Sequence, residues 1–250
     1  KIMVCVGESF DLTHIREYTV EAGRPDTVTK EKLEVIKRCG ATRISINPQT
    51  MNDNVLEAIG RKHTAADTVA AFSLARELGF DNINMDLIIG LPGESRKELA
   101  NSLDETEKLM PESLTVHTLS FKRASEMTQN RKKYKVADRK EVEAMMEMAE
   151  RWTARHDYDP YYLYRQKNIL GNLENVGYSK RGQESIYNIM IMEELQTIIG
   201  IGCGAASKFI DSETGKIEHF ANPKDPKSYN DSFIIYTEKK IEILKKLFGM

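Results

Sequence analysis

The alternation of short strand-like segments with helix-forming segments most constrains what this chain can fold into. Four segments rich in β-forming residues are each followed by a stretch that favours a helix. They are residues 17–22, 43–47, 83–89 and 114–119. Because parallel strands need a crossover between them, this order predicts a parallel sheet covered by helices, and hence an α/β fold.

Helix start signals lie where this alternation requires them. Thr29 can cap a helix that ends near Gly40. A Thr-x-x-Asp sequence from Thr64 and a Ser-x-x-Glu sequence from Ser95 are capping patterns that open two further helices. Beyond about residue 125 the rhythm changes to a charged stretch, an amphipathic helix that contains Trp152, and a long C-terminal helix. The two halves of the chain are therefore expected to differ in architecture.

Composition excludes several classes of protein. The 250 residues can bury a large core, and 40% of them are hydrophobic and 30% charged, as in globular proteins. No apolar run approaches the roughly 20 residues that span a bilayer, so we expect no membrane insertion. The 36 basic and 38 acidic residues leave a net charge of -2, which gives no electrostatic reason to expect nucleic acid as a partner.

The three cysteines, Cys5, Cys39 and Cys203, are isolated and lack the spacing of a metal or cluster site. They are expected to be free thiols of a cytoplasmic protein, and no metal ligand is predicted in this chain. The first ten residues lack the length and pattern of a signal peptide, and the chain begins at Lys1 instead of Met. We interpret this start as that of a processed or trimmed form.

Polar side chains recur on one face of three expected strands. Side chains alternate between the faces of a strand, so the residues on each face can be sorted from sequence. The opposite face carries the apolar residues Val20, Ile44, Ile46, Met85 and Leu87. The polar face carries Thr19 and Glu21, then Ser45 and Asn47 with Gln49 beyond them, then Asn84 and Asp86.

This polar face has two explanations. A closed (β/α)8 barrel fills its interior with apolar side chains, and a buried carboxylate without a partner is costly. An open or incomplete barrel, whose concave face binds a polar small molecule near the carboxyl ends of the strands, accommodates such residues. A solvent-exposed face of an ordinary sheet is the alternative, although agreement among three strands favours the ligand site.

Three passages resemble the oxygen-independent coproporphyrinogen III oxidases of the radical S-adenosylmethionine (SAM) superfamily. They are residues 17–25, residues 43–50 with the later Ile-Gly-Arg at 59–61, and residues 84–95, which contain Asp-Leu-Ile-Ile-Gly-Leu-Pro-Gly. Residues 161–168 and 200–208 further resemble the subgroup called coproporphyrinogen dehydrogenases. The resemblance implies a partial TIM-like radical SAM barrel at 1–125, and an α+β extension at 126–250 that completes the barrel and the substrate region.

The resemblance also implies roles in binding SAM. Glu21 matches the family glutamate that receives the ammonium, Arg61 the arginine that pairs with the carboxylate, and Gln49 and Asp86 the pair that holds the ribose hydroxyls. Taken singly, Glu21 is better explained as a helix cap or as a partner of Arg24, and Arg61 as a surface charge. Residues 90–93 are also explained as a strand-to-helix turn.

The family motif Cys-x-x-x-Cys-x-x-Cys, which holds a 4Fe-4S cluster, does not occur in this sequence. The resemblance therefore assigns the cluster and its ligands to an upstream part of the intact protein, and this chain alone is expected to be inactive. The intact enzyme is expected to take an electron from an external donor and to oxidise two propionates of coproporphyrinogen III to vinyl groups through a 5′-deoxyadenosyl radical, which yields protoporphyrinogen IX. No residue is assigned a catalytic role.

A substrate with four carboxylates needs cations, and macrocycles often pack on aromatic rings. Tyr161, Tyr162 and Tyr164 could flank the ring, although core packing explains them as well. Surface solvation is the ordinary role of the basic residues. The basic candidates on strand ends or loops are Arg24, Arg123, Arg165 and Lys167.

Two further functions stay open. A haem-binding or haem-transfer protein of the same superfamily branch would share most of these residues. A barrel aldolase or isomerase could use Asp86 and Glu21 as acid and base, although no lysine or metal trio accompanies them in the sequence. The glycine-rich residues 200–204 lack the Lys and Ser/Thr of a phosphate loop, so we expect a close backbone approach there.

Overall fold

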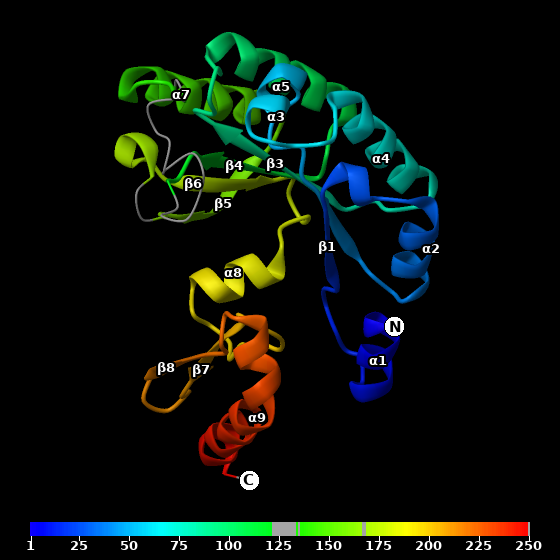
Figure 1. Cartoon of the computed structure of the whole chain (residues 1–250), viewed down its shortest axis with the longest axis vertical. Helices are drawn as coiled ribbons and strands as arrows, with labels where there is room; N and C mark the ends of the chain where they lie inside the picture. Colours follow the sequence, from blue (N-terminus) through cyan, green and yellow to red (C-terminus); the bar gives the residue numbers. More distant parts are fainter. Residues whose placement is uncertain (122–133, 135, 167–168, 250) are drawn as a thin grey trace. The chain divides into compact units, whose positions relative to one another are not determined.

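The computed structural model describes residues 1–121, 134, 136–166 and 169–249 of the chain (Figure 1). The chain divides into two compact units, Lys1–Ile186 and Tyr187–Met250, each of which is described by itself below. The parallel strands end shortly before residue 125, but the first unit continues beyond them to Ile186.

The first unit is built on a six-stranded sheet with the order β1-β2-β3-β4-β6-β5. The expected α/β class is confirmed, because β1 to β4 are parallel neighbours. β6 is antiparallel to both β4 and β5, so β5 runs in the direction of the first four strands. The strands are β1 Thr19–Gly23, β2 Arg43–Ile46, β3 Ile83–Ile89, β4 Ser113–Thr118, β5 Asp159–Tyr164 and β6 Asn175–Ser179.

Three helices of this unit begin at the predicted caps. Thr29 accepts a hydrogen bond from the backbone of Lys32 at 3.4 Å, and both Thr64 and Ser95 form complete capping boxes. The chain leaves α4 by a left-handed turn at Gly79, which has a φ of 80°. The helices are α1 Ile2–Ser9, α2 Lys30–Arg38, α3 Asp53–Ala58, α4 Ala65–Glu77, α5 Arg96–Leu109 and α7 Arg139–Arg155, with 3-10 turns η1 Pro25–Thr27 and η3 Leu170–Asn172.

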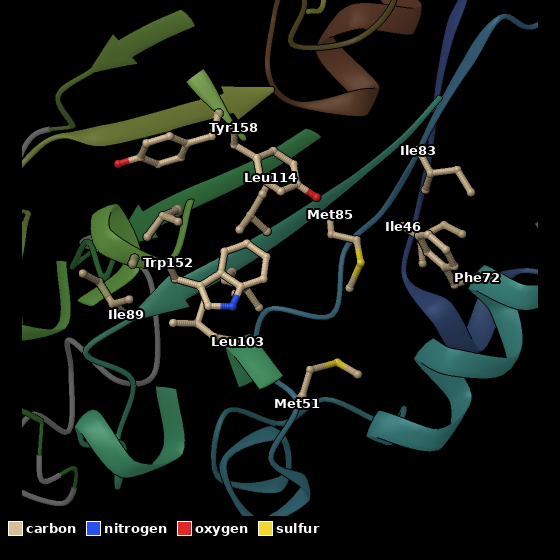
Figure 2. Packing of buried hydrophobic residues seen from close by; sticks show 14 of the residues in the cluster. Ile46, Met51, Phe72, Ile83, Met85, Ile89, Leu103, Leu114, Trp152 and Tyr158 are labelled. Atoms are coloured by element: carbon tan, nitrogen blue, oxygen red, sulfur yellow. The ribbon is translucent and has the colours of Figure 1, made fainter. Parts of the chain in front are cut away.

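Helices α2, α4, α5 and α7 cover one face of the sheet (Figure 1). The core lies between them and the apolar side of the strands, where Ile44, Met85 and Leu114 are each 0% exposed. Trp152 of α7 packs near Leu114 and Leu103 in this layer (Figure 2). Burial of this face drives the sheet and helices together, and leaves the opposite face of the strands for polar residues.

The second unit pairs a hairpin with a long helix. β7 Ala206–Ile210 and β8 Ile217–Ala221 form an antiparallel pair, preceded by α8 Ile186–Met192. α9 Pro226–Phe248 begins at Asp225, which accepts a hydrogen bond from the backbone of Ser228 at 2.7 Å. A Cβ at Gly200 would lie 2.4 Å from the carbonyl oxygen of Ala206, so the close backbone approach expected of residues 200–204 is confirmed. No described helix has the length and apolarity needed to cross a membrane.

Candidate functional site

A row of hydrogen-bonded polar side chains crosses the face of the sheet opposite the helices. Asn84 on β3 lies at its centre and donates to Ser45 of β2 at 3.2 Å and to Asp86 at 2.7 Å. Thr115 of β4 donates to the Asn84 side-chain oxygen at 3.4 Å, and Ser45 donates to Asn47 at 2.7 Å. The prediction that Ser45 and Asn47 share one face with Asn84 and Asp86 is confirmed. Ser45 is 0% and Asn84 5% exposed, so this part of the face is not an ordinary solvated surface.

Two carboxylates project from this face. Glu21 on β1 is exposed at its surface, yet desolvation by the surrounding protein raises the pKa of its carboxyl group, and the negative charge of Asp86 on β3 raises it further. Hydrogen bonds from Ser45 and Asn47 and the positive charge of Arg43 act in the opposite direction on this pKa. The two acids are thus close enough to repel each other, and a bound cation would relieve that repulsion.

Gln49 follows β2 and lies beside Asp86. Its backbone N–H donates to the Asp86 carbonyl oxygen at 3.0 Å, and its carbonyl accepts from the backbone of Ile88 at 2.8 Å. The φ of Gln49 is 73°, a left-handed conformation that is uncommon for residues other than glycine. These bridges bring the Gln49 amide, whose nitrogen donates to the Asn47 carbonyl oxygen at 3.4 Å, to the end of β3.

Arg61 follows α3 and is half-buried. Burial lowers its pKa and the charge of Arg24 lowers it further, whereas the charge of Asp26 raises it. Within the described part of the chain, the Arg61 guanidinium has no hydrogen bond or ion pair. It is therefore available to pair with the carboxylate of a ligand.

Arg24 is already engaged. Its Nε and Nη2 donate to the two carboxylate oxygens of Asp26 at 3.0 and 2.7 Å. The alternative in which Glu21 pairs with Arg24 is therefore wrong, because the shorter reach within the 3-10 turn gives Arg24 to Asp26. Arg165 is exposed and pairs with Glu174 at 3.1 Å. The other predicted substrate cations, Arg123 and Lys167, lie outside the described residues.

Sequence reasoning missed the part of the site that comes from β4. His117 lies with Nε2 3.5 Å from the Asp86 carboxylate, and its Nδ1 is 3.0 Å from the Tyr164 hydroxyl. The Tyr162 hydroxyl is 3.2 Å from Thr115. The same alternation that sorted the first three strands, continued along the fourth, would have placed Thr115 and His117 on the polar face.

The turn after β3 is anchored by a buried acid. Glu94 is 5% exposed, accepts from Thr50 at 3.2 Å and from the backbone of Leu91 at 3.3 Å, and burial raises its pKa to about 8. Gly90 has a φ of 80°, and a Cβ there would lie 2.9 Å from Leu170 and 3.2 Å from Val142. Residues 90–93 therefore do form a strand-to-helix turn, and its packing holds the carboxyl end of β3, the strand that carries Asp86.

The comparisons with known proteins agree with this architecture. A sequence model described as the radical SAM superfamily matches residues 8–106. The fold is that of the coproporphyrinogen III oxidase HemN of Escherichia coli, with a TM-score of 0.70 at 19% identity over 92% of this chain and 52% of that one. This match identifies residues 8–106 as a radical SAM domain. This match favours the radical SAM interpretation over the aldolase or isomerase interpretation of Asp86 and Glu21.

Two curated proteins from Bacillus subtilis (strain 168) are similar to this chain in sequence. The chain is 70% identical over 238 residues to the oxygen-independent coproporphyrinogen-III oxidase-like protein HemZ. This alignment covers 95% of this chain and 48% of HemZ. The chain is also 31% identical over 234 residues to the heme chaperone HemW. This alignment covers 91% of this chain and 58% of HemW. The chain spans about half the length of the curated relatives it matches.

The superfamily implies two bound groups, SAM and a 4Fe-4S cluster. The described residues fit the first and not the second. SAM fits, because two acids and an amide converge on one face and Arg61 offers a cation without a partner among the described side chains. The cluster does not fit, because the described residues contain no group of three His, Cys, Asp or Glu side chains that could hold a metal. Cys5 and Cys203 are exposed free thiols.

Proposed function

We propose that the polar face of β1 to β3, with the loops that follow these strands, binds SAM. Glu21 receives the ammonium group, Arg61 the carboxylate, and Gln49 and Asp86 the ribose hydroxyls. The observation that carries this proposal is one hydrogen-bonded polar face, on which Asn84 donates to Asp86 at 2.7 Å and the charge of Asp86 reaches Glu21. A ligand that is both cationic and rich in hydroxyl groups satisfies both acids at once.

Each residue acts on the ligand through its charge or its hydrogen bonds. Glu21 must be ionised to accept the ammonium, and a bound cation lowers the pKa that burial and Asp86 have raised, so binding favours release of a proton from Glu21. Asn84 donates to one oxygen of Asp86, and the Asp86 side chain stays 20% exposed. When bound beside a reduced cluster, SAM supplies radical chemistry that removes hydrogen from an unactivated carbon.

SAM binding by the full-length gene product tests this site. Glu21→Gln and Asp86→Asn each remove a charge without changing shape, and each is expected to weaken the calorimetric Kd for SAM by about tenfold or more. Glu147→Gln is the matched control, because Glu147 is an exposed acid that pairs with Arg151 on α7. Wild-type affinity in both site variants would show that SAM does not bind here.

We further propose that the complete protein oxidatively decarboxylates two propionates of coproporphyrinogen III, with cluster ligands that lie outside the described residues and an electron from an external donor. The 70% identity to the coproporphyrinogen-III oxidase-like protein supports this reaction. The 31% identity to a heme chaperone supports a second candidate, a protein that binds and transfers haem. Anaerobic turnover of the porphyrinogen separates the two.

A further inference from the structure

Each oxygen of the Asp86 carboxylate has a polar neighbour. Asn84 donates to Oδ1 at 2.7 Å, and the imidazole Nε2 of His117 lies 3.5 Å from Oδ2. The side chains of His117 and Asp86 are 22% and 20% exposed, so the pair is partly open to a ligand. His117 comes from β4, where no sequence motif pointed to it.

A chain of donors extends from His117 to β5. The amide nitrogen of Gln166 donates to the Tyr164 hydroxyl at 3.3 Å, and that hydroxyl is 3.0 Å from His117 Nδ1. An amide nitrogen only donates, so the Tyr164 oxygen accepts from Gln166 and its own proton is free for Nδ1. A histidine that accepts at Nδ1 carries its proton on Nε2, which faces the carboxylate. Every donor in this chain thus points toward Asp86.

Two features keep the Tyr164 hydroxyl protonated and in place beside His117. Burial raises the pKa of the Tyr164 hydroxyl, and the nearby charge of Asp86 raises it as well, while the hydrogen bond from Gln166 opposes them. The Tyr164 ring stacks on Tyr162 at 6.2 Å with an interplanar angle of 6°, and Tyr162 is itself tied to Thr115. The tyrosine is therefore both protonated and fixed in place.

We infer that His117 is a positioning residue, which aims the Asp86 carboxylate at the hydroxyl pair of the ligand and is itself oriented by Tyr164. This inference rests on the proposed binding of SAM, in which Asp86 holds the ribose. A carboxylate fixed by two neighbours loses little freedom when the ligand binds, and that preorganisation strengthens binding.

Calorimetric titration of the full-length gene product with SAM tests the inference. His117→Phe keeps the ring shape but removes both nitrogens, and it is expected to weaken SAM binding by about tenfold. His117→Gln restores an N–H donor toward Asp86 and should recover most of the affinity. Tyr164→Phe removes only the hydroxyl and should cause a smaller loss. His156→Phe is the matched control, because His156 lies 3.2 Å from Glu107 at a similar side-chain exposure of 20% and stacks on Trp152.

The Asp86→Asn background separates this inference from the proposed function. If His117 acts through Asp86, adding His117→Phe to Asp86→Asn causes no further loss. Equal losses from His117→Phe in both backgrounds, or a His117→Gln variant as weak as His117→Phe, would overturn the positioning role while SAM binding stands. Unchanged affinity in Glu21→Gln and Asp86→Asn would instead overturn the proposed function itself.

Discussion

At the scale of single residues, Glu94 shows how a buried acid can serve structure while its neighbours serve binding. Among the acidic residues that the structure describes, it alone is buried, and its oxygens accept from Thr50 and from the backbone of the turn after β3. Burial raises its pKa from 4.5 to about 8. The folded protein therefore holds a proton at Glu94 under conditions where the unfolded chain has lost it.

This difference makes stability depend on pH. Because the folded state binds the proton more tightly, the free energy of unfolding is expected to fall as pH rises from about 4.5 to about 8, by up to roughly 4 kcal/mol. Glu94→Gln keeps the shape, carries no charge and should remove most of this loss. Urea unfolding at pH 5.5 and 8.5 measures it, with Glu105→Gln as control, because Glu105 lies on the following helix α5, is 30% exposed and pairs with Lys108. An equal loss in Glu94→Gln and wild type would contradict the assignment.

Gln49 and His117 show what a single sequence can and cannot reveal at this scale. The polar face could be sorted in advance because the direction of a side chain depends only on its place in the strand. The left-handed backbone of Gln49 was not predictable, because it exists to bridge β3, which is distant in sequence. His117 was within reach of the same sorting, but its contact with Asp86 depends on the register of β3 with β4.

At the scale of elements, the contact between β5 and β6 depends on one glycine. The Tyr162 ring lies directly over Gly177 of β6, and a Cβ at this position would be 1.8 Å from the ring. Gly177 has no side chain, so the Tyr162 ring can lie over it and reach Thr115. The glycine therefore supports the stacked pair of Tyr162 and Tyr164.

Gly177→Ala is therefore expected to destabilise the protein by about 1–3 kcal/mol, because the ring must move from its place. Urea unfolding measures the loss. Removing the ring with Tyr162→Ser should cancel most of the added cost of Gly177→Ala, which a double-mutant cycle reports. Gly7→Ala is the control, because a Cβ at Gly7 on the exposed helix α1 meets nothing within 4 Å. A cost that persists without the ring would point to the backbone of β6 instead.

Local signals predicted most of the first unit at this scale. Capping residues and strand-forming segments placed the first four strands and the helices between them, because these signals act over a few residues. The antiparallel β6 and its insertion between β4 and β5 had no such signal, since strand order is decided by which edges meet in the folded sheet.

At the scale of the whole molecule, the choice between porphyrinogen oxidation and haem transfer belongs to the full-length protein. We expect anaerobic reduced protein to convert coproporphyrinogen III in the presence of SAM, with release of carbon dioxide, and to bind haem only weakly in a titration. Glu21→Gln should abolish turnover while the cluster absorption stays unchanged. Stoichiometric haem binding without turnover would favour the second candidate.

The sequence by itself determined the α/β class, the starts of helices α2, α4 and α5, the polar face and the likeness to radical SAM proteins, because each depends on the local order of residues or on short motifs. Only the tertiary structure decided that Arg24 belongs to Asp26, that Gln49 bridges to Asp86, and that His117 and Tyr164 complete the surroundings of that acid. The physical reason is that these contacts join strands and loops far apart in the chain, whose register is set only when the apolar face of the sheet packs against its helices.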